Sequence, residues 1–368
     1  MHKPLTGGII MATALAAGAA ANPFGFVYEG AITENKPGEV NVRPVRYRTG
    51  NGVAIAANLY LPAGWSEDDA RRWPAVTVAH PNGGVKEQVA GLYAQRLAEA
   101  GFVALAADAA CQGESGGEPR LRDWPENRIE DVSSMVDFLA TLPQVDAARI
   151  GSLGICGGGG YTVAAAQRDK RIRAVAAVSP FNSGRVRRNG FLDADPAGAA
   201  ARLERAAAAR NAALAGAEPS IEGFLPSRDP DVLRERMAAL PRGLYRDGIE
   251  YYGITHAHPR SSGSYTTESF QKLVAFDVED RMDLLTQPLL VAAGTDADTK
   301  YMADAIVEKA VNAASRELFA VEGATHIETY WKHPFVDQIG DRLAAFFAEN
   351  LGAAAAPESP APAAAERP

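Results

Sequence analysis

The cysteine at position 156 has the neighbours that a reactive thiol needs. It lies in Gly154-Ile155-Cys156-Gly157-Gly158, between an apolar stretch and a stretch with helical spacing. A strand, a sharp turn and a helix that meet at one residue strain its backbone and leave no room for side chains two positions away. The start of the helix also favours a thiolate. The pattern predicts a nucleophile at Cys156; the alternative is a buried structural cysteine.

A thiol is mostly protonated near neutral pH, so a nucleophilic cysteine needs a base. His326 follows the last predicted strand, where a strand–turn–helix nucleophile of this kind has its histidine. The loop 294–300 contains Asp296 and Asp298, and we favour Asp298 as the acid that orients His326. The other carboxylate could cap the next helix. A loop histidine without a role is the alternative interpretation of His326.

Backbone N–H groups are expected to stabilise the oxyanion of an acyl-transfer reaction. Gly157, directly after the nucleophile, would give one, and the loop 80–87 would give the other. Pro81 has no N–H, so Asn82 is the predicted second donor. His80 is expected to hold this loop in place. Glu87 could approach the nucleophile across the site, but it is given no catalytic role; its alternative fates are to pair with Lys86 or to lie in solvent.

The second cysteine and the polar residues that follow the strand 102–110 suggest no further chemistry. The chain has two cysteines, which excludes a disulfide framework and a four-cysteine zinc site. Cys111 is expected to be a bystander. Asp108, Gly113 and Ser115 are expected to form a turn. No metal or organic cofactor is implied.

Strands and helices alternate along most of the chain, which predicts an α/β protein with a mostly parallel, doubly wound sheet covered on both faces. The first two strands should form an antiparallel hairpin around the turn 49–52. Predicted strands span residues 40–47, 53–61, 74–80, 102–110, 149–155, 172–179, 288–294 and 317–321, and predicted helices 88–100, 129–142, 157–168, 301–314 and 336–351.

The alternation stops between residues 181 and 282, which we interpret as a helical cap inserted between two parts of the core, 23–180 and 283–351. The cap should contain helices at 196–214 and 231–240, followed by an aromatic stretch. In that stretch Tyr251, Tyr252 and His256 are predicted to bind substrate, with Tyr245, His258 and Tyr265 as further candidates. Packing of the cap on the core is the alternative role.

Charge and the chain ends limit the remaining possibilities. The formal net charge is −8 and there is no extended basic run, which argues against nucleic-acid binding. The basic cluster 185–188 is interpreted as a solvated loop. No segment is apolar enough for stable membrane insertion.

Residues 1–22 fit a short export signal, which would make the protein periplasmic or secreted. The alternative is that they form an Ala-rich extension of a cytoplasmic protein. Residues 352–368 are predicted to form a disordered tail.

Together these motifs resemble bacterial α/β-hydrolases grouped with dienelactone hydrolases. The resemblance rests on the cysteine elbow, the loop 80–87, the run from Asp108 to Gly117 and Gly323-Ala324-Thr325-His326-Ile327, and it covers residues 40–351. It implies a cysteine nucleophile at Cys156, a histidine at His326 and an acid in the loop 294–300. The long insertion departs from the family, so the resemblance implies a mechanism and no particular substrate.

The expected function is hydrolysis of a small-molecule ester, thioester or lactone through an acyl-cysteine intermediate. An acyltransferase or a carbon–carbon bond enzyme on the same scaffold is one alternative. A non-catalytic binding protein with this fold is another. The sequence leaves a homodimer open.

Overall fold

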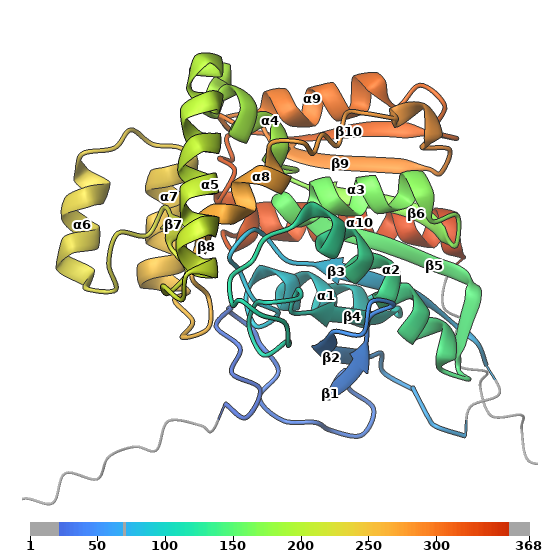
Figure 1. Ribbon diagram of the computed structural model, residues 1–368. Coiled ribbons are helices and arrows are strands. Elements are labelled where there is room, and N and C mark those ends of the chain that lie inside the picture. Colours follow the sequence, from blue (N-terminus) through green and yellow to red (C-terminus); the bar gives the residue numbers. More distant parts are fainter. Residues whose placement is uncertain (1–21, 69–70, 353–368) are drawn as a thin grey trace, which may run out of the picture.

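The computed structural model describes residues 22–68 and 71–352, and it is built on one eight-stranded sheet (Figure 1). The strand order is β1-β2-β4-β3-β5-β6-β9-β10. β1 and β2 form the expected antiparallel hairpin, β2 is antiparallel to β4, and the other pairs are parallel. The strands are β1 (Asn41–Arg48), β2 (Ala54–Leu61), β3 (Trp73–Ala79), β4 (Val103–Ala107), β5 (Val145–Ile155), β6 (Ile172–Val178), β9 (Leu289–Gly294) and β10 (Arg316–Val321).

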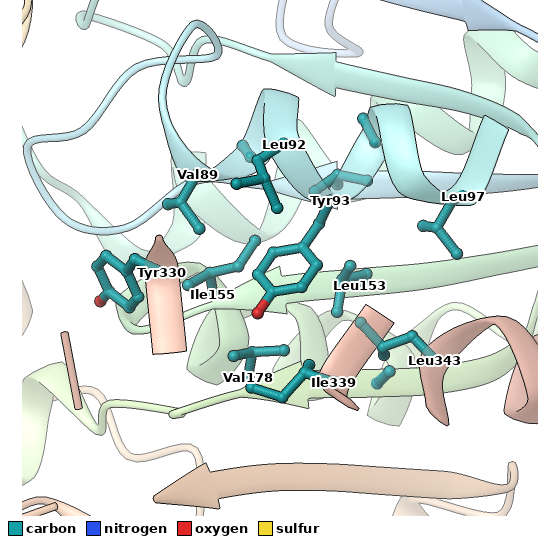
Figure 2. Close-up of a cluster of buried hydrophobic side chains, with 14 of the residues drawn as sticks. Val89, Leu92, Tyr93, Leu97, Leu153, Ile155, Val178, Tyr330, Ile339 and Leu343 are labelled. Atoms are coloured by element: carbon teal, nitrogen blue, oxygen red, sulfur yellow. The ribbon is translucent and has the colours of Figure 1, made fainter. Parts of the chain in front are cut away.

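Helices cover both faces of this sheet. Val76 and Val78 of β3 enter one hydrophobic cluster, while Ala75 and Ala79 enter the other, as alternating side chains of a buried strand must. Figure 2 shows part of the first cluster, between α1, α10 and the strands. On that face lie α1 (Val89–Glu99) and α10 (Phe335–Leu351); α2 (Pro125–Thr141), α3 (Gly157–Arg168) and α9 (Lys300–Lys309) lie on the other.

The predicted core elements agree with the observed ones apart from some of their ends. α2 begins at Pro125, four residues early, because proline is well suited to the first helical turn. α9 ends at Lys309 rather than at residue 314. The residues after it bond elsewhere: the N–H of Ala314 donates to Thr286, and Ser315 accepts from Leu289. The predicted leader and tail fall outside the described residues, apart from Asn22 and Gly352.

The insertion, residues 181–282, extends beyond one end of the sheet (Figure 1). Both predicted helices are present, as α5 and α6, but the small antiparallel sheet of β7 and β8 was not predicted. The elements of the insertion are α4 (Ser183–Asn189), α5 (Ala199–Leu214), β7 (Ile221–Gly223), α6 (Pro230–Ala238), α7 (Leu244–Glu250), a π-helical turn (Tyr251–Thr255), β8 (Ser264–Thr266) and α8 (Phe270–Leu273).

Short 3-10 turns complete the chain, at Phe191–Asp193, Pro196–Gly198, Thr267–Ser269, Met282–Leu284 and Glu328–Tyr330. None of the helices in the described ranges is long and apolar enough to cross a membrane.

Candidate active site

Cys156 lies at the turn between β5 and α3 with φ 55° and ψ −124°, a conformation that side-chain-bearing residues rarely adopt. A Cβ atom added to Gly154 would lie 2.2 Å from the carbonyl oxygen of Gly158. One added to Gly158 would lie 2.4 Å from the carbonyl oxygen of Ala79. The glycines on both sides of Cys156 are therefore required by packing, as the sequence pattern indicates.

The thiol of Cys156 is buried and faces an internal cavity. Burial raises its pKa, because a low-polarity environment disfavours the thiolate. The hydroxyl of Tyr330 and the N–H groups of Gly157 and Asn82 hydrogen-bond to the sulfur and oppose this effect. Burial is the larger contribution, so the resting group is the neutral thiol and not the thiolate that the helix terminus alone would favour.

Tyr330 connects Cys156 with His326. Its hydroxyl oxygen lies 2.8 Å from Nε2 of His326, and the same hydroxyl contacts the sulfur of Cys156. No direct hydrogen bond joins Cys156 and His326 in the described part of the chain. The ring of Tyr330 belongs to the hydrophobic cluster of Figure 2, and its hydroxyl points away from the neighbours labelled there. Burial lowers the pKa of His326 to about 3, so its imidazole is neutral.

The other ring nitrogen of His326 contacts a hydroxyl rather than a carboxylate. Nδ1 lies 2.6 Å from Oγ1 of Thr299. The neighbouring Asp298 instead accepts a hydrogen bond of 2.9 Å from the N–H of Leu244, at the start of α7. Asp296 forms an ion pair of 3.0 Å with Arg242. Neither carboxylate is hydrogen-bonded to His326. Each is instead engaged by a residue of the insertion, Leu244 or Arg242.

Asp298 is nevertheless in an unusual environment. Its second oxygen, Oδ1, is buried without a hydrogen-bond partner among the described residues, and burial raises the pKa of this carboxyl group. The assignment of Asp298 as the acid of a triad stays a prediction, and the observed contact to His326 is that of Thr299.

The loop after β3 is held against both the elbow and the insertion. Asn82 donates a hydrogen bond of 2.9 Å from its side chain to Ser183, at the start of α4. The carbonyl of Gly83 accepts one of 2.9 Å from the hydroxyl of Ser261. A Cβ on Gly83 would lie 2.6 Å from the backbone of Gly263. This packing fixes the N–H of Asn82 beside the sulfur of Cys156.

His80 and Glu87, at the two ends of this loop, have structural contacts. His80 is buried, with Nδ1 2.7 Å from the carbonyl of Pro81 and Nε2 accepting from the N–H of Ala109 at 2.9 Å. Burial lowers its pKa to about 4. These contacts agree with the loop-holding role predicted for His80.

Glu87 belongs to a buried ion cluster around Lys86. The ammonium of Lys86 contacts Glu87 at 2.6 Å, Asp108 at 2.9 Å and Glu114 at 2.8 Å. Glu87 thus pairs with Lys86, one of its two predicted fates. Asp108 also accepts the N–H groups of Lys86 and Glu114, which is the turn-forming role expected of it. Cys111 is buried and unpaired.

The thiol of Cys156 opens onto a cavity of about 780 Å³ between the sheet and the insertion. Of the three residues predicted to bind substrate, Tyr252 lines this cavity, while Tyr251 and His256 do not. The rings of Tyr251 and His256 stack on each other instead, with 4.5 Å between their centroids. Tyr251 and Tyr252 are successive residues of the π-helical turn, and their side chains point in different directions. The cavity wall is largely apolar, and its aromatic residues include Phe181, Phe191, Phe224, Tyr245, Tyr265 and Phe270.

Three residues of the site were missed in the sequence: Tyr330, Thr299 and Arg187. Tyr330 follows His326 by four residues on a helical turn, a spacing that brings side chains together and could have indicated it. The cluster 185–188 is not a solvated loop but helix α4. Arg185 pairs with Asp193, while Arg187 lines the cavity.

Comparison with known proteins agrees with this architecture. Residues 51–236 match the family described as X-Pro dipeptidyl-peptidase (S15 family). The uncharacterized protein YcjY of Escherichia coli K12 is 38% identical over 307 residues, covering 81% of this chain and 95% of that protein. A thiohydrolase of Eupenicillium brefeldianum is 27% identical over 266 residues, covering 71% of this chain and 79% of the relative.

Two solved structures share the fold. The crystal structure of the hypothetical protein PA2218 of Pseudomonas aeruginosa superposes with a TM-score of 0.73 at 32% identity, over 85% of this chain and 94% of that one. The α/β hydrolase GrgF of Penicillium sp. sh18 superposes with a TM-score of 0.66 at 20% identity, over 84% and 99%, which bears on the fold alone.

The sheet order, the elbow and these comparisons define a hydrolase of the α/β-hydrolase superfamily. Within it, the chain belongs to the X-Pro dipeptidyl-peptidase (S15) family. The family match includes the elbow and Asn82 but ends before Thr299 and His326, so it carries no information about the base. The closer resemblance to dienelactone hydrolases stays a prediction.

Proposed function

We propose that the protein hydrolyses thioesters and activated esters, lactones included, through an acyl intermediate on Cys156. One observation carries the proposal: Tyr330 and the N–H groups of Asn82 and Gly157 all contact the sulfur, and Tyr330 also contacts the imidazole of His326. A nucleophile, a route for its proton and two oxyanion donors thus surround one point on the cavity wall.

The proton of the thiol leaves through Tyr330. With the imidazole proton on Nδ1, donated to the hydroxyl oxygen of Thr299, Nε2 of His326 accepts the proton of Tyr330. The tyrosine oxygen takes the proton of Cys156 at the same time, so Tyr330 remains neutral throughout. Because burial disfavours a resting thiolate, proton transfer accompanies attack on the carbonyl carbon.

The sulfur–carbon bond forms as the carbonyl becomes an oxyanion, which accepts hydrogen bonds from Asn82 and Gly157. The adduct collapses when the bond to the leaving group breaks and that group takes the proton held by His326, returned through Tyr330. Water then attacks the acyl-cysteine, His326 receives its proton by the same route, and the thiol of Cys156 is restored as the acid departs.

Thioesters and activated esters suit this nucleophile better than amides do. From a tetrahedral adduct, the thiolate of Cys156 leaves more readily than an amine, so an amide adduct would mostly revert. The similarity to a thiohydrolase supports a thioester substrate. The peptidase activity in the family name is not proposed for this chain.

The test is hydrolysis of a p-nitrophenyl ester and a matched acyl thioester by the wild type and by Cys156→Ala and His326→Ala. Each variant should lose at least about a thousandfold in kcat while its melting temperature is retained. Mass spectrometry of the quenched wild type should find the acyl group on Cys156 and not on Cys111. Wild-type-like turnover by either variant would contradict the mechanism. Acyl release only with an added acceptor would indicate an acyltransferase, and no adduct at all a binding protein.

A further inference from the structure

Arg187 brings a positive charge to the wall of the cavity onto which Cys156 opens. It lies on α4, five residues after Asn182, and lines the cavity together with Asn82 and Cys156. Its guanidinium stands over the ring of Tyr265, 4.8 Å from the centroid. No carboxylate lies within ion-pair distance of Arg187 in the described residues, and its Nε is buried without a hydrogen bond.

Two other charged groups of the cavity wall, Arg202 and Glu222, have partners of their own. Arg202 forms an ion pair of 2.6 Å with Asp195. Glu222 lies 3.9 Å from Arg205 and accepts the hydroxyl of Tyr265 at 3.2 Å.

Asp123 is a carboxyl group of the cavity wall that interacts electrostatically with the guanidinium of Arg187. Asp123 is buried and forms an ion pair of 3.5 Å with Arg128. Arg128 thus pairs with this carboxylate directly, whereas Arg187 interacts with it only at longer range. Arg236, also on the wall, is exposed on α6.

A guanidinium without an ion-pair partner in a largely apolar cavity is costly unless an anion binds there. Its planar array of N–H groups matches a carboxylate in two parallel hydrogen bonds. We propose that Arg187 binds a carboxylate of the substrate while the scissile carbonyl lies at Cys156. The substrate class is then an ester or thioester that also bears a carboxylate, which rests on the proposed function and narrows it.

The proposal is tested with two pairs of substrates. The first pair is the p-nitrophenyl half-ester of adipic acid and the same compound with its carboxylate capped as a methyl ester. The second is the acetate ester of 4-hydroxybenzoic acid and that of its methyl ester, which places the carboxylate on the leaving group. The wild type should prefer the charged member of one pair, and the preferred pair shows which side of the scissile bond Arg187 contacts.

Arg187→Gln should raise KM for the preferred charged substrate by about 10- to 100-fold, the effect of losing a charge-assisted hydrogen bond, and leave the capped substrate within about threefold. Arg187→Lys should recover part of the loss. Arg234→Gln is the control: it removes an exposed charge of α6 that does not line the cavity, and it should change KM for neither substrate. Equal losses on charged and capped substrates would show a structural role for Arg187 and overturn the proposal, as would a wild type without preference in either pair.

A binding measurement separates this inference from the proposed function. Adipate and 4-hydroxybenzoate are titrated calorimetrically into Cys156→Ala, which cannot turn over, and into Cys156→Ala combined with Arg187→Gln. Binding of either anion that the second substitution weakens at least about tenfold supports the carboxylate site even if no ester is hydrolysed. Absence of binding, or binding independent of Arg187, would refute the site even if esters are hydrolysed.

Discussion

At the scale of single residues, the reacting groups of this site are uncharged at rest. Burial raises the pKa of the Cys156 thiol and lowers that of the His326 imidazole to about 3. A thiolate–imidazolium pair is therefore disfavoured until a substrate carbonyl and its N–H donors can take up the negative charge. Tyr330 fits this arrangement, because a hydroxyl that donates and accepts at once can pass a proton without becoming charged.

Replacing the hydroxyl of Tyr330 tests whether it carries the proton. Tyr330→Phe should lower kcat for a p-nitrophenyl ester by about a hundredfold, the usual contribution of general acid–base catalysis, with little change in KM. Tyr251→Phe is the control, since it removes a buried hydroxyl from a ring that packs edge-on against Tyr330 at 5.5 Å between centroids. That variant should stay within about threefold of the wild type. A fully active Tyr330→Phe enzyme would mean that His326 reaches Cys156 directly.

At the scale of elements, the loop between β9 and α9 has two separate tasks. Thr299 contacts Nδ1 of His326 and so helps to orient the imidazole ring. Asp298, one residue earlier, holds the N–H of Leu244 at the start of α7. These two adjacent side chains reach different partners, so one loop can orient the base and bind the insertion.

Two substitutions separate these tasks. Thr299→Val keeps the side-chain volume but removes the hydroxyl, and should lower kcat by about tenfold because the imidazole loses the hydrogen bond that orients it. Asp298→Asn keeps an acceptor for Leu244 and should leave kcat within about threefold. Both are measured with the p-nitrophenyl ester, with melting temperatures as the control for folding. The opposite ranking would restore Asp298 as the triad acid.

At the scale of the whole molecule, three hydrogen bonds hold the insertion over the site, two to the loop after β3 and one to the loop after β9. Ser183 bonds to Asn82, Ser261 bonds to Gly83, and Leu244 bonds to Asp298. Each contact joins the insertion to a loop at the carboxyl end of a sheet strand. This enclosure limits the access of water to the histidine, and desolvation is the cause of its lowered pKa.

The pH dependence of the reaction should reflect this enclosure. His326 acts as a base only when neutral, and with its pKa lowered to about 3 it stays neutral as pH falls from 8 to 5. We therefore expect kcat/KM for an uncharged ester to be flat over that range and to fall only near about pH 3, whereas an exposed histidine would titrate near about pH 6.5. Tryptophan fluorescence at each pH controls for acid unfolding. A loss centred near pH 6.5 with the fold intact would mean that the site opens to water before it reacts.

Much of this protein could be predicted from the sequence because the responsible patterns are local. The elbow needs only neighbouring residues: Cys156 with glycine two positions before and after it. The strand and helix order follows from hydrophobic periodicity, and the loop-holding role of His80 follows from its place at the end of a strand. His326 is predicted as the base in the same way, by its place after the last strand, and its catalytic role stays a prediction.

The contacts that determine the chemistry were decided only by the tertiary structure. Thr299 and His326 are separated by 27 residues, and Asn82 and Ser183 by 101. Periodicity predicts that two loops meet at the same edge of a sheet, but not which of two adjacent side chains turns inward, since that depends on packing between loops. The sequence therefore determined that Cys156 stands at a strained elbow with a histidine nearby. Only the tertiary structure placed Thr299 rather than Asp298 at the imidazole, the hydroxyl of Tyr330 beside the thiol, and Arg187 in the cavity wall.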